Sequence, residues 1–417
     1  MTHHDGSAAV KAHDVLADRY LLSHIVSYQR GVPGCIVALE REQADRMGET
    51  GILASLAIER GSLRTLQALV QVCEDFPWYK PLRKMDLSSA MDAAALHGRL
   101  EMLQWMHEHT DLECLPWTFA VASRAGHRDV VQWLFAHRPE SMAKFEPFSM
   151  DRVAEEGHLE LFQWLETHVR VPCTPSAMDS AALCGRLEMV RYLHEHRTEG
   201  CTTTAMDLAA LKGHLDVVRF LHEHRSEGCT PWAMDSAAAY GRMDVLRFLH
   251  ENRPEGCTVR AMNDAAGFGR MDVVRFLHES RSEGCDRAAL RRAAKRGNLE
   301  MLRFLHENYH QHCSRDGIMA AAEEGHLEAV RYLNETCSAS SGLAITNAAV
   351  AGHLDIVQYL VETRNDGCLL AARDKAVKAG QTHVVEYLET LLVPGLERCG
   401  NGNHTRESAW RVCQRLE

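Results

Sequence analysis

The sequence predicts an all-α fold, an elongated α-solenoid of about twelve short helix pairs. A glycine recurs at a nearly constant interval through most of the 417 residues. A segment with paired alanines and apolar residues at helical spacing precedes each glycine, and a second amphipathic segment follows it. The glycines, most of them 28 residues apart, are Gly61, Gly98, Gly126, Gly157, Gly185, Gly213, Gly241, Gly269, Gly297, Gly325, Gly352 and Gly380. One pair cannot bury its apolar stripe by itself, so the pairs are expected to stack.

The unit around Gly241 shows why the first half of each unit should be helical. Thr230 is a natural N-cap, and Pro231 suits the first position of a helix because its missing N–H is not needed there. Met234 and Ala237 then fall on one face of the helix. Gly241 ends the helix, because glycine enters the left-handed backbone region freely.

A second helix follows the glycine of the same unit. Met243, Leu246 and Leu249 recur at intervals of three residues, and this helix should end near Arg253. A short Pro-Glu-Gly-Cys-Thr stretch then turns the chain into the next unit.

Composition and charge exclude several classes of function. The chain has 46 Lys and Arg against 57 Asp and Glu, a net charge of -11, which argues against a binder of nucleic acid or of an anionic membrane. No apolar run approaches the roughly 18 residues of a membrane span. The first residues are polar and lack the apolar core of a secretion signal. We therefore expect a monomer that is intracellular, in the cytoplasm or the nucleus, and not secreted.

The units resemble those of the ankyrin-repeat family. The resemblance lies in paired alanines followed by Gly-His-Leu-Asp-Val-Val, as in residues 209–218 and in similar form at 351–357, and it covers about four fifths of the chain. It is closest to the large intracellular ankyrin-repeat proteins of oomycetes and related protists. Family units usually have 33 residues and a Thr-Pro-Leu-His opening, whereas most units here have 28 residues and Ala-Met-Asp at that place. The shorter unit implies reduced or absent β-hairpin tips.

The repeat divides the chain into three parts. These are an N-terminal helical cap at 1–49, the ankyrin-repeat solenoid at 50–392 and a polar tail at 393–417. The segment 14–40 also looks faintly like an F-box, the helical module that joins substrate receptors to ubiquitin ligases. A cap that covers the first repeat is the simpler interpretation, because solenoid ends need polar covers.

One short motif suggests an enzyme. His306, Glu307 and His310 form His-Glu-x-x-His, which on a helix can bind zinc with the glutamate as general base. However, His-Glu occupies the same repeat position in other units, at residues 194, 222, 250 and 278 among others, so the repeat and one added histidine explain the motif. We predict no enzyme activity, no metal and no cofactor.

Three further rows recur with the repeat, and we assign them to the scaffold. Cysteines from Cys173 to Cys313 recur every 28 residues and should fill the turns as reduced thiols, because equivalent atoms of stacked helices lie roughly 8–10 Å apart, too far for a disulfide. An aromatic residue lies seven positions after almost every glycine and should pack between repeats. Arginines such as Arg219 are predicted to pair with the glutamate four residues later, here Glu223.

Positions that differ between copies are free to serve binding. The two residues before each glycine vary most, and the residue nine positions before it also varies. The resemblance implies that the first helix lines a concave groove where partners bind, and that these positions are exposed there. Aromatic residues and arginine are favoured anchors in interfaces. The candidate partner-binding residues are Trp232, Tyr240, Arg260, Phe268, Arg291, Lys295 and Arg296.

The order of these residues suggests the chemistry of the partner. An aromatic step at Tyr240 and Phe268 is followed by a basic helix and then by Glu323 and Glu324. We also place Asp179, Asp207 and Asp235, six residues before their glycines, on this surface. The pattern favours a non-enzymatic scaffold that binds an extended, apolar and acidic segment of another protein. Drift on a solvated face is the alternative for the site, and a ubiquitin-ligase substrate receptor is the alternative for the function.

Overall fold

The computed structural model of the chain describes residues 53–75, 89–309, 315–336, 342–363 and 367–392. These residues form two compact units. Unit 1 contains residues up to 181 together with 188–200, and unit 2 contains 182–187 and 201–392. Within the described residues the chain forms helices and turns and no β-strand. The predicted cap, the F-box-like segment and the predicted tail lie outside the described residues, so the ligase alternative stays a prediction.

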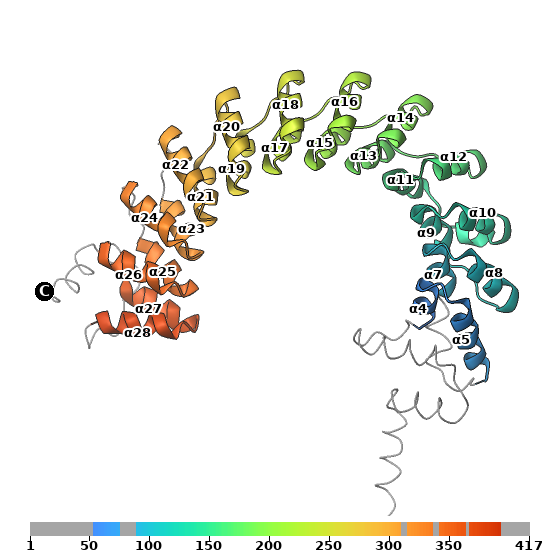
Figure 1. Ribbon diagram of the computed structural model, residues 1–417, viewed down its shortest axis with the longest axis horizontal. Helices are drawn as coiled ribbons and strands as arrows, with labels where there is room; N and C mark the ends of the chain where they lie inside the picture. Colours follow the sequence, from blue (N-terminus) through green and yellow to red (C-terminus); the bar gives the residue numbers. More distant parts are fainter. Residues whose placement is uncertain (1–52, 76–88, 310–314, 337–341, 364–366, 393–417) are drawn as a thin grey trace, which may run out of the picture. The chain divides into compact units, whose positions relative to one another are not determined.

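The described residues contain twelve helix pairs, each with a first helix before the repeated glycine and a second helix after it (Figure 1). The first helices are α4 (Leu53–Glu59), α7 (Ala90–Leu96), α9 (Thr118–Ala125), α11 (Pro147–Glu156), α13 (Pro175–Leu183), α15 (Thr203–Lys212), α17 (Pro231–Ala239), α19 (Val259–Gly267), α21 (Arg287–Lys295), α23 (Arg315–Glu323), α25 (Gly342–Ala351) and α27 (Leu369–Lys378). The second helices are α5 (Leu63–Asp75), α8 (Leu100–His109), α10 (Arg128–His137), α12 (Leu159–His168), α14 (Leu187–His196), α16 (Leu215–His224), α18 (Met243–Asn252), α20 (Met271–Ser280), α22 (Leu299–Asn308), α24 (Leu327–Thr336), α26 (Leu354–Thr363) and α28 (Thr382–Leu391). A 3₁₀ turn, η1 (Pro139–Met142), precedes α11. The prediction of an all-α array of about twelve helix pairs is confirmed.

The local signals act as predicted where a first helix begins and ends. Thr230 caps α17 by accepting a hydrogen bond from the backbone N–H of Trp232 at 3.3 Å, and Pro231 is the first helical residue. At the end of α15, Gly213 has φ +88° and its N–H donates to the carbonyl of Ala209 at 2.9 Å. A Cβ on Gly213 would lie 2.8 Å from Cδ of Arg242 in the next pair. Glycine is therefore required there by both the backbone angle and the close approach.

Small residues bring the first helices together. In unit 2, α15, α17, α19, α21, α23, α25 and α27 pack consecutively against one another. The paired alanines, such as Ala209 and Ala210 in α15 and Ala237 and Ala238 in α17, have no exposed surface. Short side chains allow the helix axes to approach closely, so the first helices form a continuous buried layer.

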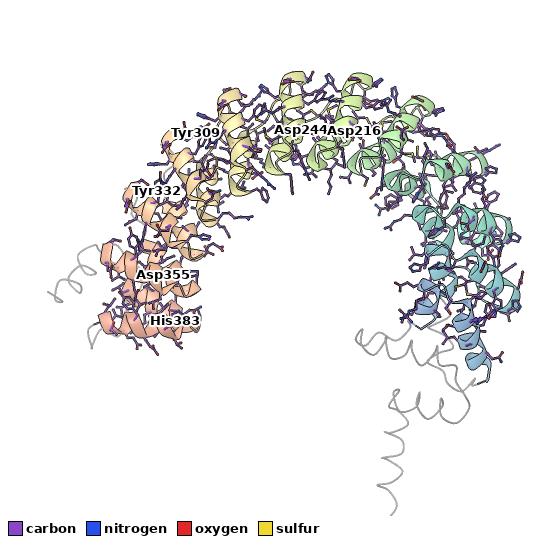
Figure 2. All side chains as sticks on the ribbon, viewed as in Figure 1. Asp216, Asp244, Tyr309, Tyr332, Asp355 and His383 are labelled. Carbon is purple, nitrogen blue, oxygen red and sulfur yellow. The ribbon has the colours of Figure 1, made fainter. Side chains whose placement is uncertain are left out.

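The second helices are joined by the aromatic row. The ring of Phe248 meets His222 of the preceding pair edge to face, with centroids 5.4 Å apart. Tyrosines of the row add hydrogen bonds: Tyr332, labelled in Figure 2, meets His306 edge to face and bonds to its Nδ1 at 3.2 Å, and Asn334 donates to Tyr359 at 3.1 Å. The predicted role of the aromatic row in packing between repeats is confirmed by these contacts.

The arginine row differs from the prediction. The guanidinium of Arg219 lies 5.6 Å from the centre of the Phe248 ring in the next pair, and that of Arg247 lies 4.9 Å from the centre of the Phe276 ring. Two members of the row form ion pairs, but with other carboxylates than predicted, Arg275 with Glu300 and Arg331 with Glu328. A half-buried ring attracts the guanidinium and its aliphatic stem more than a fully solvated glutamate does.

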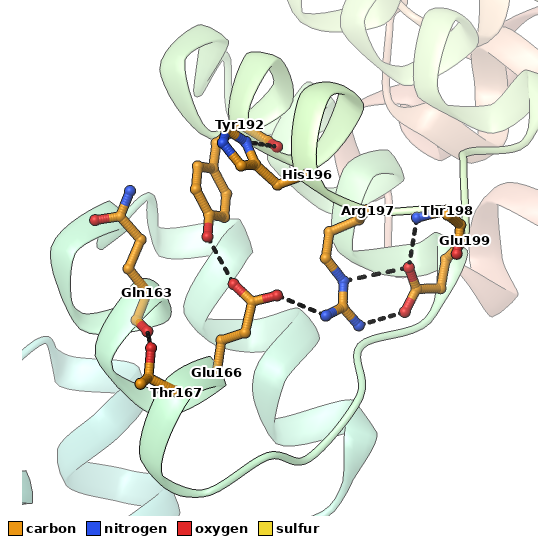
Figure 3. Close-up of polar contacts among 8 residues, drawn as sticks. All are labelled: Gln163, Glu166, Thr167, Tyr192, His196, Arg197, Thr198 and Glu199. Carbon is orange, nitrogen blue, oxygen red and sulfur yellow. Dashed lines mark hydrogen bonds and ion pairs between the residues drawn. The ribbon is translucent and has the colours of Figure 1, made fainter.

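The turns between pairs are held by an arginine and the glutamate two residues later (Figure 3). In unit 1, Arg197 donates to Glu199 through Nε at 3.2 Å and to Glu166 of the preceding pair at 2.6 Å. The Tyr192 hydroxyl donates to the other oxygen of Glu166 at 2.6 Å. Cys173 lies beside Arg197, and burial raises the pKa of its thiol to about 11. The same turn recurs at Arg225, Arg253 and Arg281.

Candidate protein-interaction surface

The seven candidate residues lie on exposed positions of three neighbouring first helices of unit 2. We name the exposed side of α17, α19 and α21, together with the residues that cap their C-terminal ends, the first-helix face. Each of the seven side chains is exposed on this face. They are Trp232 in α17 and Tyr240 at its end, Arg260 in α19 and Phe268 at its end, and Arg291 and Lys295 in α21 with Arg296 at its end.

The structure brings three of these residues into contact. The rings of Tyr240 and Phe268 are stacked, with centroids 5.7 Å apart and planes 28° from parallel, and each residue is 48% exposed. The guanidinium of Arg296 lies 5.9 Å from the centre of the Phe268 ring. Each of the three immediately precedes a repeat glycine with positive φ. They therefore occupy equivalent positions in three consecutive repeats. The result is a solvent-accessible strip of two rings and one cation.

Trp232 and Arg260 lie at the opposite ends of the same helices. Trp232 precedes Tyr240 by eight positions, and Arg260 precedes Phe268 by eight, which is about 12 Å along a helix. Trp232 is 41% exposed. The candidate residues therefore form two groups, one at the N-terminal ends of the first helices and one at their C-terminal ends.

The basic helix α21 contains two kinds of cation. Lys295 forms an ion pair with Glu324 at 3.2 Å, and Arg292 forms one with Asp264. Arg287 and Arg291 are exposed and form no ion pair with another described residue, and the same holds for Arg260 in α19. We call Arg260, Arg287 and Arg291 the unpaired arginines. In the sequence the cations of α21 look equivalent, and only the structure shows which of them form ion pairs.

The aspartates six residues before the glycines are not on this surface, which corrects the sequence analysis. Asp179, Asp207 and Asp235 are buried. Asp207 accepts hydrogen bonds from the N–H and the hydroxyl of Thr230, at 2.8 and 2.7 Å, and burial raises the pKa of its carboxyl. The aspartate of one pair thus holds the N-terminus of the next first helix. A sequence signal existed, because Asp207 and Asp235 are each followed by a threonine 23 residues later.

Two residues that sequence analysis overlooked shape the contact between α19 and α21. Asp264 is the partner of Arg292. A Cβ on Gly267 would lie 3.1 Å from Cδ and 3.2 Å from Cβ of Arg292, so the glycine leaves room for the arginine chain to cross α19. The two preceding units have serine or leucine in place of Asp264 and alanine or leucine in place of Gly267.

The described side chains offer little for metal or nucleophilic chemistry. Nδ1 of His306 is bonded to Tyr332, and His310 lies outside the described residues. No three metal-binding side chains cluster anywhere in the part of the chain that the structure describes. Burial raises the pKa of the Cys257 and Cys285 thiols to about 12, so they are protonated at neutral pH. In the same described part, no helix combines the length and the apolar character that a membrane span needs.

Comparison with known families agrees with this architecture. Residues 150–235 and 290–374 match a family model described as ankyrin repeats (3 copies), and residues 259–306 match one described as ankyrin repeats (many copies). No curated protein sequence matches the chain. Only ankyrin repeats were found, a repeat type that is typically non-catalytic and that serves protein interaction. The consecutive helix pairs and these matches lead to one conclusion: residues 150–374 contain ankyrin repeats, within a helical repeat architecture.

Proposed function

We propose that the chain is a non-enzymatic scaffold that binds an extended segment of a partner protein on the first-helix face of α17, α19 and α21. The observation that carries this proposal is the exposed stack of Tyr240 and Phe268 bordered by Arg296. Exposed aromatic rings and arginines that are fixed in place are typical anchors of interfaces. Because buried helices hold these side chains in register, little conformational entropy is lost when a partner binds.

The partner has apolar and acidic residues. An apolar side chain is expected to contact the two rings, and carboxylates are expected to contact cations of the first-helix face. Trp232 adds apolar surface at the N-terminal end of α17. Since the net charge of the whole chain is -11, the basic group on this face attracts an acidic segment locally and does not make the protein a general polyanion binder. The proposed partner is thus a protein and neither nucleic acid nor membrane.

The test compares two pairs of exposed aromatic residues. The full chain, the variant Tyr240→Ala/Phe268→Ala and the control Trp117→Ala/Phe148→Ala are used to capture proteins from native extract, and captured proteins are quantified by mass spectrometry. Trp117 and Phe148 are exposed by 48% and 68% in unit 1, so the control removes similar apolar surface elsewhere.

We expect the first variant to lose a stoichiometric partner that the control retains. Two interface anchors contribute about 2 kcal/mol or more each, so affinity should fall at least thirtyfold. Equal capture by both variants would contradict the proposed site. Far-ultraviolet circular dichroism of the three proteins should agree, because all four residues are exposed.

A further inference from the structure

The cations on the first-helix face are not equally available to a partner. Lys295 and Arg292 are neutralised by Glu324 and Asp264 of neighbouring pairs, and Arg296 lies over Phe268. The unpaired arginines have no such contact within the described part of the chain. A carboxylate that binds Lys295 competes with Glu324, whereas Arg291 forms no ion pair with another described residue.

We propose that the partner's acidic residues bind the unpaired arginines Arg260, Arg287 and Arg291. This inference rests on the proposed function and deepens it, because it names the cations that bind the acidic residues of the partner.

The unpaired arginines lie on adjacent helices. Arg287 and Arg291 are four residues apart in α21, so one turn of helix separates them and they share a side. Arg260 is in the first turn of α19, which packs directly against α21. The neighbouring carboxylates Asp286 and Glu283 are engaged, since Asp286 accepts from the N–H of Ala288 at 2.7 Å and Glu283 pairs with Arg281. The unpaired arginines thus lie on two helices that pack together, and none of them forms an ion pair with another described residue.

Arg291 occupies a position that holds the repeats together in preceding pairs. The same position is Asp207 in α15 and Asp235 in α17, each of which accepts two hydrogen bonds from the next pair. In α19 it is Asn263, which accepts one from the N–H of Asp286 at 3.1 Å. Arginine cannot accept a hydrogen bond, so Arg291 cannot make the contact that these acceptors make. A residue that departs from the repeat in this way is typical of a position that serves binding.

Arg292 shows the opposite arrangement on the same helix. It crosses α19 through the space left by Gly267 and pairs with Asp264. Its positive charge is therefore paired within the repeat array, although Arg292 is the immediate neighbour of Arg291 in the sequence. On this helix one arginine thus forms an ion pair within the array, and the one before it forms none with another described residue.

The positions of these side chains predict how far apart the acidic and apolar residues of the bound segment are. Guanidinium groups bind carboxylates through paired hydrogen bonds, so two or three arginines suit two acidic residues. The unpaired Arg260 is about 12 Å from Phe268 along α19. An extended peptide advances about 3.3 Å per residue. The acidic residues should therefore stand about four positions from the apolar residue that contacts Tyr240 and Phe268.

The test uses a phage-displayed library of random dodecapeptides, selected on the full chain. Enriched peptides are synthesised, and their Kd is measured for two variants of α21. Arg287→Gln/Arg291→Gln removes two unpaired cations, and Arg292→Gln/Lys295→Gln removes two paired ones. The variants change the net charge equally and alter the same helix, so only the availability of the cations distinguishes them.

We expect peptides with an aromatic or aliphatic residue about four positions from an acidic pair. Their Kd should rise at least tenfold for Arg287→Gln/Arg291→Gln and less than threefold for Arg292→Gln/Lys295→Gln. The inference is overturned by the reverse ranking, by equal losses in both variants, or by enriched peptides without acidic residues. Those results leave the proposed function intact if binding still falls with Tyr240→Ala/Phe268→Ala. Peptides indifferent to that aromatic variant, or no enriched peptide at all, would overturn the proposed function itself.

Discussion

The pair α17–α18 and the pair α21–α22 have the same place in the repeat, yet they join the next pair by different contacts. In the first, Asp235 accepts hydrogen bonds from the N–H and the hydroxyl of Thr258 at 2.7 and 2.6 Å, and Arg253 pairs with Glu255 in the turn. In the second, the equivalent residues are Arg291, which is exposed, and Tyr309, which is half-buried and bonds to Nδ1 of His278 in the preceding pair at 2.9 Å. Residues that recur between copies hold the array, and both departures fall in the pair that contributes most of the unpaired cations.

The largest expected effect concerns the reactivity of two buried thiols, those of Cys257 and Cys285. Cys257 lies beside Arg281 and Glu283, whereas at Cys285 the arginine is replaced by Tyr309. Burial raises both pKa values to about 12 from 9.0, which lowers the thiolate population about a thousandfold. Iodoacetamide at pH 8 should therefore alkylate both residues at least a hundredfold more slowly in the native chain than in urea, as followed by peptide mass spectrometry. A Cys285 that reacts much faster than Cys257 would show that Tyr309 leaves its junction open.

The same shifts predict how stability depends on pH in alkali. Burial raises the folded-state pKa values of Cys114, Cys173 and Cys229 to about 11, above the unfolded value of 9.0. The unfolded chain therefore releases these protons first, so their contribution is complete below pH 9 and is lost as the pH rises toward 11 to 12. Urea unfolding at pH 8, 9, 10 and 11 should give a falling midpoint, and an unchanged midpoint would contradict the burial of the thiols.

A smaller effect tests the aspartate directly. Asp235→Ala leaves the N–H and the hydroxyl of Thr258 without their acceptor, so the free energy of unfolding should fall by about 2–3 kcal/mol. The matched control Arg291→Ala should change it by less than about 0.5 kcal/mol, because this side chain is exposed and forms no ion pair with another described residue. Since repeat arrays can unfold in parts, amide exchange at Thr258 is measured beside urea unfolding. A control that costs as much as Asp235→Ala would show that Arg291 holds the junction too.

The smallest effect concerns the second helices. Tyr192 donates a hydrogen bond to Glu166, whereas Phe248 at the equivalent position meets His222 edge to face. Tyr192→Phe should therefore cost about 1 kcal/mol in urea unfolding, and Phe248→Tyr should bring no gain. A gain from Phe248→Tyr would mean that His222 can accept the new hydroxyl, as His306 meets Tyr332.

Sequence periodicity predicted the helix pairs because each pair repeats the same signals for starting and ending a helix. Thr230 and Gly213 behave as their residue types require. Tyr240 and Phe268 could be placed on the surface because a residue directly before a repeat glycine follows the last buried alanines. These predictions depend only on neighbours in the chain or on the repeat.

The charges of the first-helix face could not be sorted in the same way. Lys295 and Arg291 look equivalent in the sequence, and their difference arises from Glu324 in the next pair. The aspartates were misplaced for a similar reason, since only the packed structure shows that Asp207 faces Thr230 of the next pair. Contacts between repeats join residues 23 to 29 positions apart in these cases, and helical periodicity within one repeat contains no information about them.

The central claim is that a partner contacts the first-helix face, and site-specific photo-crosslinking tests it most directly. A benzoylphenylalanine is placed at Tyr240, at Phe268 or at the control position Trp117 of the full chain, and native extract is irradiated. The account predicts one crosslinked protein shared by positions 240 and 268 and absent at 117, with yield reduced by Arg287→Gln/Arg291→Gln. Crosslinks to the same protein from all three positions, or none from 240 and 268, would contradict it.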